Sequence, residues 1–312
     1  MDMRGVSGNL RLGFTLSLCT AALWGVLPIA LKIVLAGMDA YTITWWRFAV
    51  AMAGLGAILA WRGQLPRFSG FGRGAVALLG LALLTLVANY VLYLVALDHT
   101  TPSVAQVVIQ LAPLLLLVGG VFVFRERFAA RQWIGFAVLA AGLLLFFNLR
   151  LPELAQPTQG LGLGVTLMIG AAIAWAIYGL AQKQLLKYFT AQQVLWLIYV
   201  GATVVMLPAA DPGEIRGLDA MQLGMLAFCC ANTLAAYGAF GEALYHWDLS
   251  RVGAVLATAP LFTIGAMWLI ERSGLALVAA EDLNALSIVG ALAVVAGSMI
   301  CALSAQSRPT EP

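Results

Sequence analysis

Polar side chains that could bind a small ligand lie in the middle of one long apolar stretch. Ser103, Gln106, Gln110 and Pro113 recur there at intervals of three and four residues. That spacing places them on one face of a helix. An amide that faces lipid loses its hydrogen bonds, so we expect this face to contact protein or a water-filled cavity. The chemistry predicted here is hydrogen bonding to a polar ligand.

Aromatic side chains supply a second group of candidate binding residues. Trp175, Tyr178 and Gln182 share one face of their apolar stretch. Trp and Tyr join a broad apolar ring to one polar group, and an ammonium group can sit over the face of the ring. Ordinary packing between helices is the alternative interpretation. The predicted substrate-binding residues are Trp24, Asn89, Tyr93, Gln106, Gln110, Trp175, Tyr178 and Tyr237.

Two prolines are expected to break the helices that contain them. Pro113 and Pro260 each lack an N–H group, which frees a carbonyl one turn earlier in the helix. Interrupted helices at corresponding positions of two halves point to a binding site between those halves. The sequence therefore predicts helix breaks at Pro113 and Pro260, with a substrate cavity beside them.

Membrane-spanning helices are needed to position these residues. Of the 312 residues, 62% are hydrophobic and 10% are charged, whereas a soluble domain carries about 25% charged residues. Ten apolar stretches are each long enough to cross a hydrocarbon core ~30 Å thick. We therefore predict an all-α integral membrane protein with ten transmembrane helices, near residues 12–35, 41–61, 74–97, 102–124, 132–148, 160–182, 190–207, 219–244, 252–270 and 284–304.

The ten stretches form two sets of five that match one another along the chain. Shifts of 151 or 147 residues superpose Trp24 on Trp175, Lys32 on Lys183, Trp45 on Trp196, Tyr90 on Tyr237 and Ala112-Pro113 on Ala259-Pro260. An odd number of crossings in each set turns the second set upside down relative to the first. Such an inverted repeat is typical of a carrier that opens alternately to the two sides of the membrane.

The division into two sets predicts the domain organisation. The first five-helix repeat is expected over residues 1–150 and the second over residues 160–312, with a linker at 151–159. Pro152, Pro157 and Gly160 mark that linker. The substrate cavity is expected between the two repeats.

Lys and Arg gather in the loops on one side of the membrane. Only Arg150, Arg216 and Arg272 fall on the other side. The positive-inside rule therefore places both termini in the cytoplasm. The expected location is a bacterial-type inner membrane. The residues on the predicted cytoplasmic side are Arg4, Arg11, Arg62, Arg67, Arg73, Arg125, Arg127, Arg131, Lys183, Lys187, Arg251 and Arg308.

Few charged residues fall inside the predicted spans. Arg47 lies ~9 Å inside its span by helix rise, and its long side chain is expected to reach back to the interface. Lys32 and Lys183 are expected to do the same. Glu242 and His246 lie near one end of their span, as a solvated helix end or, alternatively, as a gate or proton relay.

Tryptophans and small residues give two further expectations. Four tryptophans that lie near span ends or in loops are predicted to belong to an interfacial aromatic belt: Trp45, Trp46, Trp61 and Trp196. Ala137 and Ala141 on the fifth span are predicted to permit close helix packing, as are Ala293 and Gly297 on the tenth.

Several function classes lack their sequence motifs. The chain contains no Walker A sequence, no H-E-x-x-H and no serine nucleophile elbow. It carries no basic patch for nucleic acid, and its four cysteines show neither metal-site nor disulfide spacing. A channel would need a filter loop or rings of charge. No cofactor is predicted, and a channel or membrane-embedded enzyme is the alternative from another class.

Four short segments give the chain a resemblance to a known family. They are Ala21-Ala22-Leu23-Trp24-Gly25, Ala172-Ile173-Ala174-Trp175-Ala176, Ala112-Pro113 leading to Arg125-Glu126-Arg127, and Ala259-Pro260 leading to Ile270-Glu271-Arg272. The chain resembles the drug/metabolite transporter superfamily, and within it the EamA-type ten-helix carriers. It looks most like the YddG-type amino-acid exporters.

The resemblance implies export of aromatic and other neutral amino acids. Separately, the expected partners are the small-molecule substrate and the lipid bilayer, and the protein is expected to be able to act as a monomer. Export of amphipathic or cationic drugs is the alternative. A drug exporter would be expected to place a carboxylate at mid-membrane, and Glu242 lies off-centre. A neutral or zwitterionic substrate therefore fits the sequence better.

The predicted topology can be tested by labelling single cysteines introduced into the 149–159 linker after Cys19, Cys229, Cys230 and Cys301 have been replaced. These cysteines should react with a membrane-impermeant reagent from the periplasmic side of intact cells, because five crossings separate the linker from the cytoplasmic N-terminus. Lys187→Cys is the control and should react only after permeabilisation. Labelling of the linker from the cytoplasm alone would overturn the topology.

Overall fold

The computed structural model describes residues 9–66, 72–124, 130–155, 157–247, 249–275 and 277–304. Every regular element in these ranges is helical. Nine segments are long and apolar enough to cross a membrane, and the shorter apolar helix Ala130–Phe146 supplies the tenth crossing. The expected all-α fold with ten membrane helices is therefore confirmed. Some residues used in the predictions of topology and family lie outside the described residues: Arg4, Arg67, Arg125, Glu126, Arg127 and Arg308.

The first five spans contain six helices because the fourth span is divided. They are α1 (Leu10–Leu35), α2 (Ala40–Trp61), α3 (Arg73–Asp98), α4 (Pro102–Val108), α5 (Leu111–Phe124) and α6 (Ala130–Phe146). A single turn of helix, α7 (Leu151–Leu154), lies in the predicted linker.

The second five spans repeat this arrangement, and here the ninth span is divided. They contain α8 (Gly160–Leu185), α9 (Ala191–Met206), α10 (Ala220–His246), α11 (Leu249–Leu256), α12 (Ala259–Ser273) and α13 (Ala285–Ser304). Two 3₁₀ segments, η1 (Leu207–Ala209) and η2 (Pro212–Gly217), join α9 to α10.

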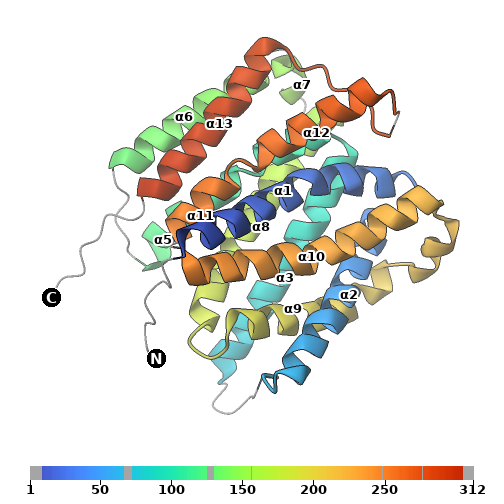
Figure 1. Ribbon diagram of the computed structural model, residues 1–312, viewed down its shortest axis with the longest axis vertical. Coiled ribbons are helices and arrows are strands. Elements are labelled where there is room, and N and C mark those ends of the chain that lie inside the picture. The colour runs from blue at the N-terminus through green and yellow to red at the C-terminus, as the bar shows by residue number, and fades with distance from the viewer. Residues whose placement is uncertain are drawn as a thin grey trace.

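Helices of one repeat pack on helices of the other in corresponding pairs. The third span, α3, packs on the sixth, α8, and in the matching pair α10 packs on α1. The fifth span packs on the tenth, and the second on the seventh. Figure 1 shows α1 beside α10 and α6 beside α13, with α3 passing behind α1 and α10. This exchange of equivalent contacts is what two inverted repeats produce.

Hydrogen bonds between α2 and α9 obey the same symmetry. Trp45 Nε1 donates to the Thr203 carbonyl at 3.0 Å, and Trp196 Nε1 donates to the Met52 carbonyl at 3.1 Å. Both donors and both acceptors are related by the same shift of 151 residues. The interfacial-belt prediction for Trp45 and Trp196 is therefore wrong: their indoles lie between helices, where each satisfies its N–H on the opposite repeat.

Glycines bring α6 and α13 into backbone contact. A Cβ on Gly142 would lie 2.6 Å from Val294 N, and one on Gly297 would lie 2.5 Å from Leu139 N. Gly135 and Gly290 make the matching contacts, so each helix uses two glycines seven residues apart. Of these four glycines, Gly297 was predicted from the sequence to permit close helix packing.

The expectation for the fifth span is wrong, because Ala137 and Ala141 are exposed. Two of the four small residues predicted for this packing thus point away from the α6–α13 contact. Seven-residue glycine spacing replaces the four-residue spacing expected from the sequence.

The fourth and ninth spans are interrupted shortly before their prolines. The fourth breaks at Ile109 and Gln110, so that Pro113 lies in the first turn of α5. The ninth breaks at Ala257 and Thr258, so that Pro260 lies at the start of α12. Proline fits the first turn of a helix because the N–H it lacks would have no partner there.

A hydrogen bond joins the two interruptions. Gln110 Nε2 donates to the Ala257 carbonyl at 2.9 Å. In a continuous helix that carbonyl would accept from Leu261 N, but Leu261 N donates to the Thr258 carbonyl instead. Gln110 and Ala257 are 147 residues apart and occupy the same place in the two repeats. The side chain of one repeat thus satisfies the backbone of its counterpart.

Gly290→Ala should lower the midpoint of thermal unfolding in detergent, because its Cβ would overlap the backbone nitrogen of Phe146. Overpacking of this kind costs ~1–3 kcal/mol. Gly238→Ala is the matched control, since a Cβ there meets nothing within 4 Å, and it should leave the midpoint unchanged or raise it. Equal midpoints for Gly290→Ala and the wild type would contradict the backbone contact.

Gln110→Leu should also destabilise the protein, because it leaves the buried Ala257 carbonyl without a donor, at a cost of ~1–3 kcal/mol. Gln106→Leu, one turn earlier, removes no donor to backbone and should destabilise less. Tryptophan fluorescence during heating measures both. If Gln106→Leu proves as destabilising as Gln110→Leu, the bond between the interruptions has no special importance.

Candidate functional site

Aromatic rings from both repeats meet between the helix pairs. Trp24 on α1 packs edge-on against Tyr237 on α10, with ring centroids 5.6 Å apart, and lies 5.9 Å from Phe240. Tyr237 and Trp175 also border an apolar cluster that contains Tyr178. Four of the predicted binding residues are thus brought into one aromatic region, to which each repeat contributes.

The remaining predicted residues carry polar groups, and each of them has a hydrogen-bond partner within the protein. Tyr93 on α3 donates its hydroxyl to Gln106 Oε1 at 3.3 Å, and Gln106 is buried on α4. Gln110 is buried two residues beyond the end of α4, and its amide nitrogen is engaged by Ala257. Its oxygen is the group left for a ligand.

Asn89 connects α3 to α8. Its Nδ2 donates to the Ala171 carbonyl at 2.9 Å. In the equivalent pair of helices, Asn232 on α10 makes a similar bond, to the Leu23 carbonyl on α1, at 2.7 Å. Asn89 therefore links two helices through its amide nitrogen. Only its side-chain oxygen remains available to contact a substrate.

Arg47 is a site residue that the sequence interpretation missed. Its side chain was expected to reach the interface, but it is only 5% exposed. Nε donates to Thr233 Oγ1 on α10 at 3.2 Å, and Cζ lies 4.5 Å from the centroid of the Tyr90 ring on α3. The available signal was a charged residue seven positions into an apolar helix whose sequence supplies no acidic partner.

Other charged groups lie at helix ends. Lys32 Nζ donates to the carbonyls of Leu97 and Asp98, at 2.8 Å each, and so satisfies the C-terminus of α3. This is a favourable place for a cation, because the last carbonyls of a helix carry partial negative charge. Lys32 was expected to reach the interface, and the structure shows that its ammonium group ends at the C-terminus of a neighbouring helix.

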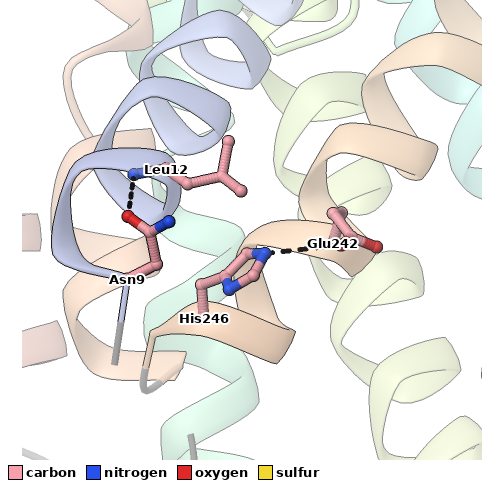
Figure 2. A network of polar contacts seen from close by, with 4 residues as sticks. All are labelled: Asn9, Leu12, Glu242 and His246. Carbon is pink, nitrogen blue, oxygen red and sulfur yellow. Dashed lines mark hydrogen bonds and ion pairs between the residues drawn. The ribbon is translucent and has the colours of Figure 1, made fainter. Parts of the chain in front are cut away.

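The Glu242–His246 pair lies where α10 approaches the start of α1. His246 Nε2 is 3.4 Å from Glu242 Oε1. Figure 2 shows this pair near Asn9, whose side chain accepts from Leu12 N at 3.1 Å and begins α1. Glu242 is 60% exposed, so the pair lies at a helix end rather than among the rings of the site.

The end of the molecule that carries the linker is closed by bonds between the repeats. Asp211 N donates to Thr42 Oγ1 at 2.9 Å, and Asp39 N donates to Glu214 Oε2 at 3.1 Å. Ser103 N, at the start of α4, donates to Glu281 Oε1 at 3.0 Å. A buried apolar cluster that includes Leu31, Leu97 and Leu226 fills the space beneath these contacts.

Metal-binding geometry is not found in the part of the chain that the structure describes. No three His, Cys, Asp or Glu side chains gather there as metal ligands would. Cys229 and Cys230 are buried free thiols. The site so assembled consists of aromatic rings, amides, hydroxyls and one guanidinium, which suits reversible binding of a small polar molecule with an apolar part.

Comparisons with known proteins agree with this architecture. The profile of the EamA-like transporter family matches residues 11–148 and again residues 162–303. An uncharacterized transporter of Haemophilus influenzae is 40% identical over 298 residues, which cover 96% of this chain and 97% of that protein. The uncharacterized inner membrane transporter YhbE of Escherichia coli K12 is 39% identical and covers 94% of this chain and 91% of its own length.

More distant similarities also extend over nearly the whole chain. A probable amino-acid metabolite efflux pump of Salmonella typhimurium is 22% identical over 309 residues, covering 95% of this chain and 96% of that protein. A crystal structure of another protein superposes with a TM-score of 0.62 at 17% identity, covering 97% of this chain and all of that one. Two consecutive matches to one family profile, on a ten-helix membrane fold with an internal repeat, show that this chain belongs to the EamA-like transporter family.

Proposed function

We propose that this transporter exports small neutral or zwitterionic metabolites, with amino acids, including aromatic ones, as its substrate class. The observation that carries the proposal is the meeting of rings and polar groups from both repeats between the α1–α10 and α3–α8 pairs. Trp24, Trp175, Tyr178 and Tyr237 would hold an apolar side chain. Tyr93, Gln106 and the oxygens of Asn89 and Gln110 would bind the polar end.

The more distant relatives support this substrate class. The Salmonella typhimurium protein described as a probable amino-acid metabolite efflux pump matches nearly the whole chain. The likeness to YddG-type amino-acid exporters noted in the sequence points the same way. Neither fixes which amino acid is carried, whereas the mixture of rings and amides favours substrates that have both an apolar and a polar part.

Alternating access is the mechanism we infer from the arrangement of the repeats. The linker end is closed by the contacts of Asp211, Asp39 and Ser103. With both termini in the cytoplasm, this arrangement would admit substrate from the cytoplasmic side. Rocking of one repeat against the other would break these contacts and close the opposite end, with the bond between the two interruptions near the pivot.

A single chain would suffice for this cycle, because one chain supplies both repeats and every residue of the site. The partners we propose are therefore the small-molecule substrate and the lipid bilayer of a bacterial inner membrane, with no nucleic acid. Export of amphipathic cations is not favoured. The one carboxylate within α10 is Glu242, which is exposed at a helix end beside His246.

The proposal is tested by counterflow in proteoliposomes with a panel of amino acids, with and without a proton gradient. Trp175→Ala should weaken the apparent affinity for phenylalanine and tryptophan more than that for threonine, because it removes an aromatic contact worth ~0.5–1.5 kcal/mol beyond buried area. Trp61→Ala is the matched control, since Trp61 is 87% exposed. Counterflow of lipophilic cations but of no amino acid would instead support a drug exporter.

A further inference from the structure

The guanidinium of Arg47 is a buried positive charge for which the described residues supply no carboxylate. Burial of an unpaired charge is costly in a membrane protein, so such residues commonly have a partner in the working state. The acidic residues within the membrane helices are Asp98, Glu242 and Glu271, and all three lie within the last five residues of their helices. None of them forms an ion pair with Arg47.

The surroundings of Arg47 fix its direction. Thr233 donates its hydroxyl to the Cys229 carbonyl at 2.9 Å, which orients the lone pairs of Oγ1 toward Arg47 Nε, 3.2 Å away. Tyr90 lies against one face of the guanidinium, with its ring centroid 4.5 Å from Cζ. Three helices, α2, α3 and α10, therefore hold this side chain, and they come from both repeats.

The two terminal nitrogens of Arg47 are left for a ligand. Nε is the guanidinium nitrogen that has a hydrogen-bond acceptor within the described ranges. The side chain is 5% exposed, so a small part of it is not covered by protein. A planar guanidinium with two free parallel donors matches the two oxygens of a carboxylate.

We propose that Arg47 binds the carboxylate of the substrate and thereby restricts transport to molecules that carry one. This inference deepens the proposed function and rests on it. The substrate carboxylate would neutralise the buried charge, while the hydrogen-bonded pair Tyr93 and Gln106 would offer further polar contacts. The ammonium of an amino acid would then face the rings of Trp24 and Tyr237.

The first test needs no variant. Wild-type proteoliposomes should carry L-phenylalanine with an apparent affinity about 10- to 100-fold above that for L-phenylalaninamide or phenethylamine, the loss expected for charge-assisted hydrogen bonds. Equal apparent affinities for the acid and the amide would overturn the assignment. Arg47→Gln should weaken L-phenylalanine by a similar factor and L-phenylalaninamide much less, because the amide keeps only a neutral carbonyl acceptor. Phenethylamine has no acceptor for Arg47 and should be unchanged.

Two control variants separate charge, geometry and position. Arg47→Lys keeps the charge but loses the paired donors, so its affinity should lie between those of the wild type and Arg47→Gln. Arg62→Gln alters an exposed arginine at the end of the same helix and should leave both substrates unchanged. If Arg47→Gln weakens the acid and the amide equally, Arg47 has a structural role and the proposal is wrong.

Failure of the proposed function is distinguished by a binding measurement. If no amino acid exchanges, amino-acid transport is wrong, and phenylacetate is then compared with phenylacetamide by the shift each causes in the thermal unfolding of purified protein. Stabilisation by phenylacetate alone, absent in Arg47→Gln, would still support a carboxylate site. Equal shifts for the two compounds, or an unchanged phenylacetate shift in Arg47→Gln, would overturn it.

Discussion

The hydrocarbon interior offers no water to an unsatisfied backbone group, and the rest of this structure depends on that constraint. Continuous helices satisfy it by themselves. An interrupted helix does not, because it exposes carbonyls at the point where a binding site needs irregular backbone. Here the carbonyl of Ala257 receives its hydrogen from Gln110, which lies at the interruption of the other repeat. The first repeat therefore supplies the hydrogen bond that the interruption of the second repeat lacks.

Because the repeat is inverted, several contacts between helices occur twice, once in each direction between the two repeats. Trp45 and Trp196 exchange equivalent hydrogen bonds across α2 and α9, and Asn89 and Asn232 tie equivalent helix pairs. In the contact between α6 and α13, each helix contributes two glycines in equivalent positions. Lipid is as apolar as most of these side chains, so close packing and interhelical hydrogen bonds, rather than hydrophobic burial, hold the repeats together.

Symmetry is broken where a substrate would bind. Gln110 faces an alanine in the other repeat, and Arg47 corresponds by the shift of 151 residues to Ile198. The symmetric scaffold thus carries one buried guanidinium and one buried amide that have no counterpart in the other repeat. An amino acid is also asymmetric along its length: a charged backbone at one end and a side chain at the other. The contacts that stabilise the scaffold come in matched pairs, whereas the groups suited to recognition are single.

The sequence by itself determined the ten spans, the repeat and the neighbourhood of the helix breaks. Hydropathy and proline act locally, so a stretch of apolar residues or a missing N–H can be recognised without knowledge of its neighbours. The sequence also selected Trp24, Tyr237, Tyr93 and Gln106, which the structure places in two direct contacts.

Only the tertiary structure decided which way the side chains face. In a helix that is apolar on every side, lipid-facing and protein-facing positions have the same composition, so the sequence did not show that Gly135 and Gly142, rather than Ala137 and Ala141, meet α13. For the same reason Trp45 and Arg47 were assigned to the interface. Their polar groups have partners on α9, α3 and α10, and those helices reach them only when the two repeats are packed together.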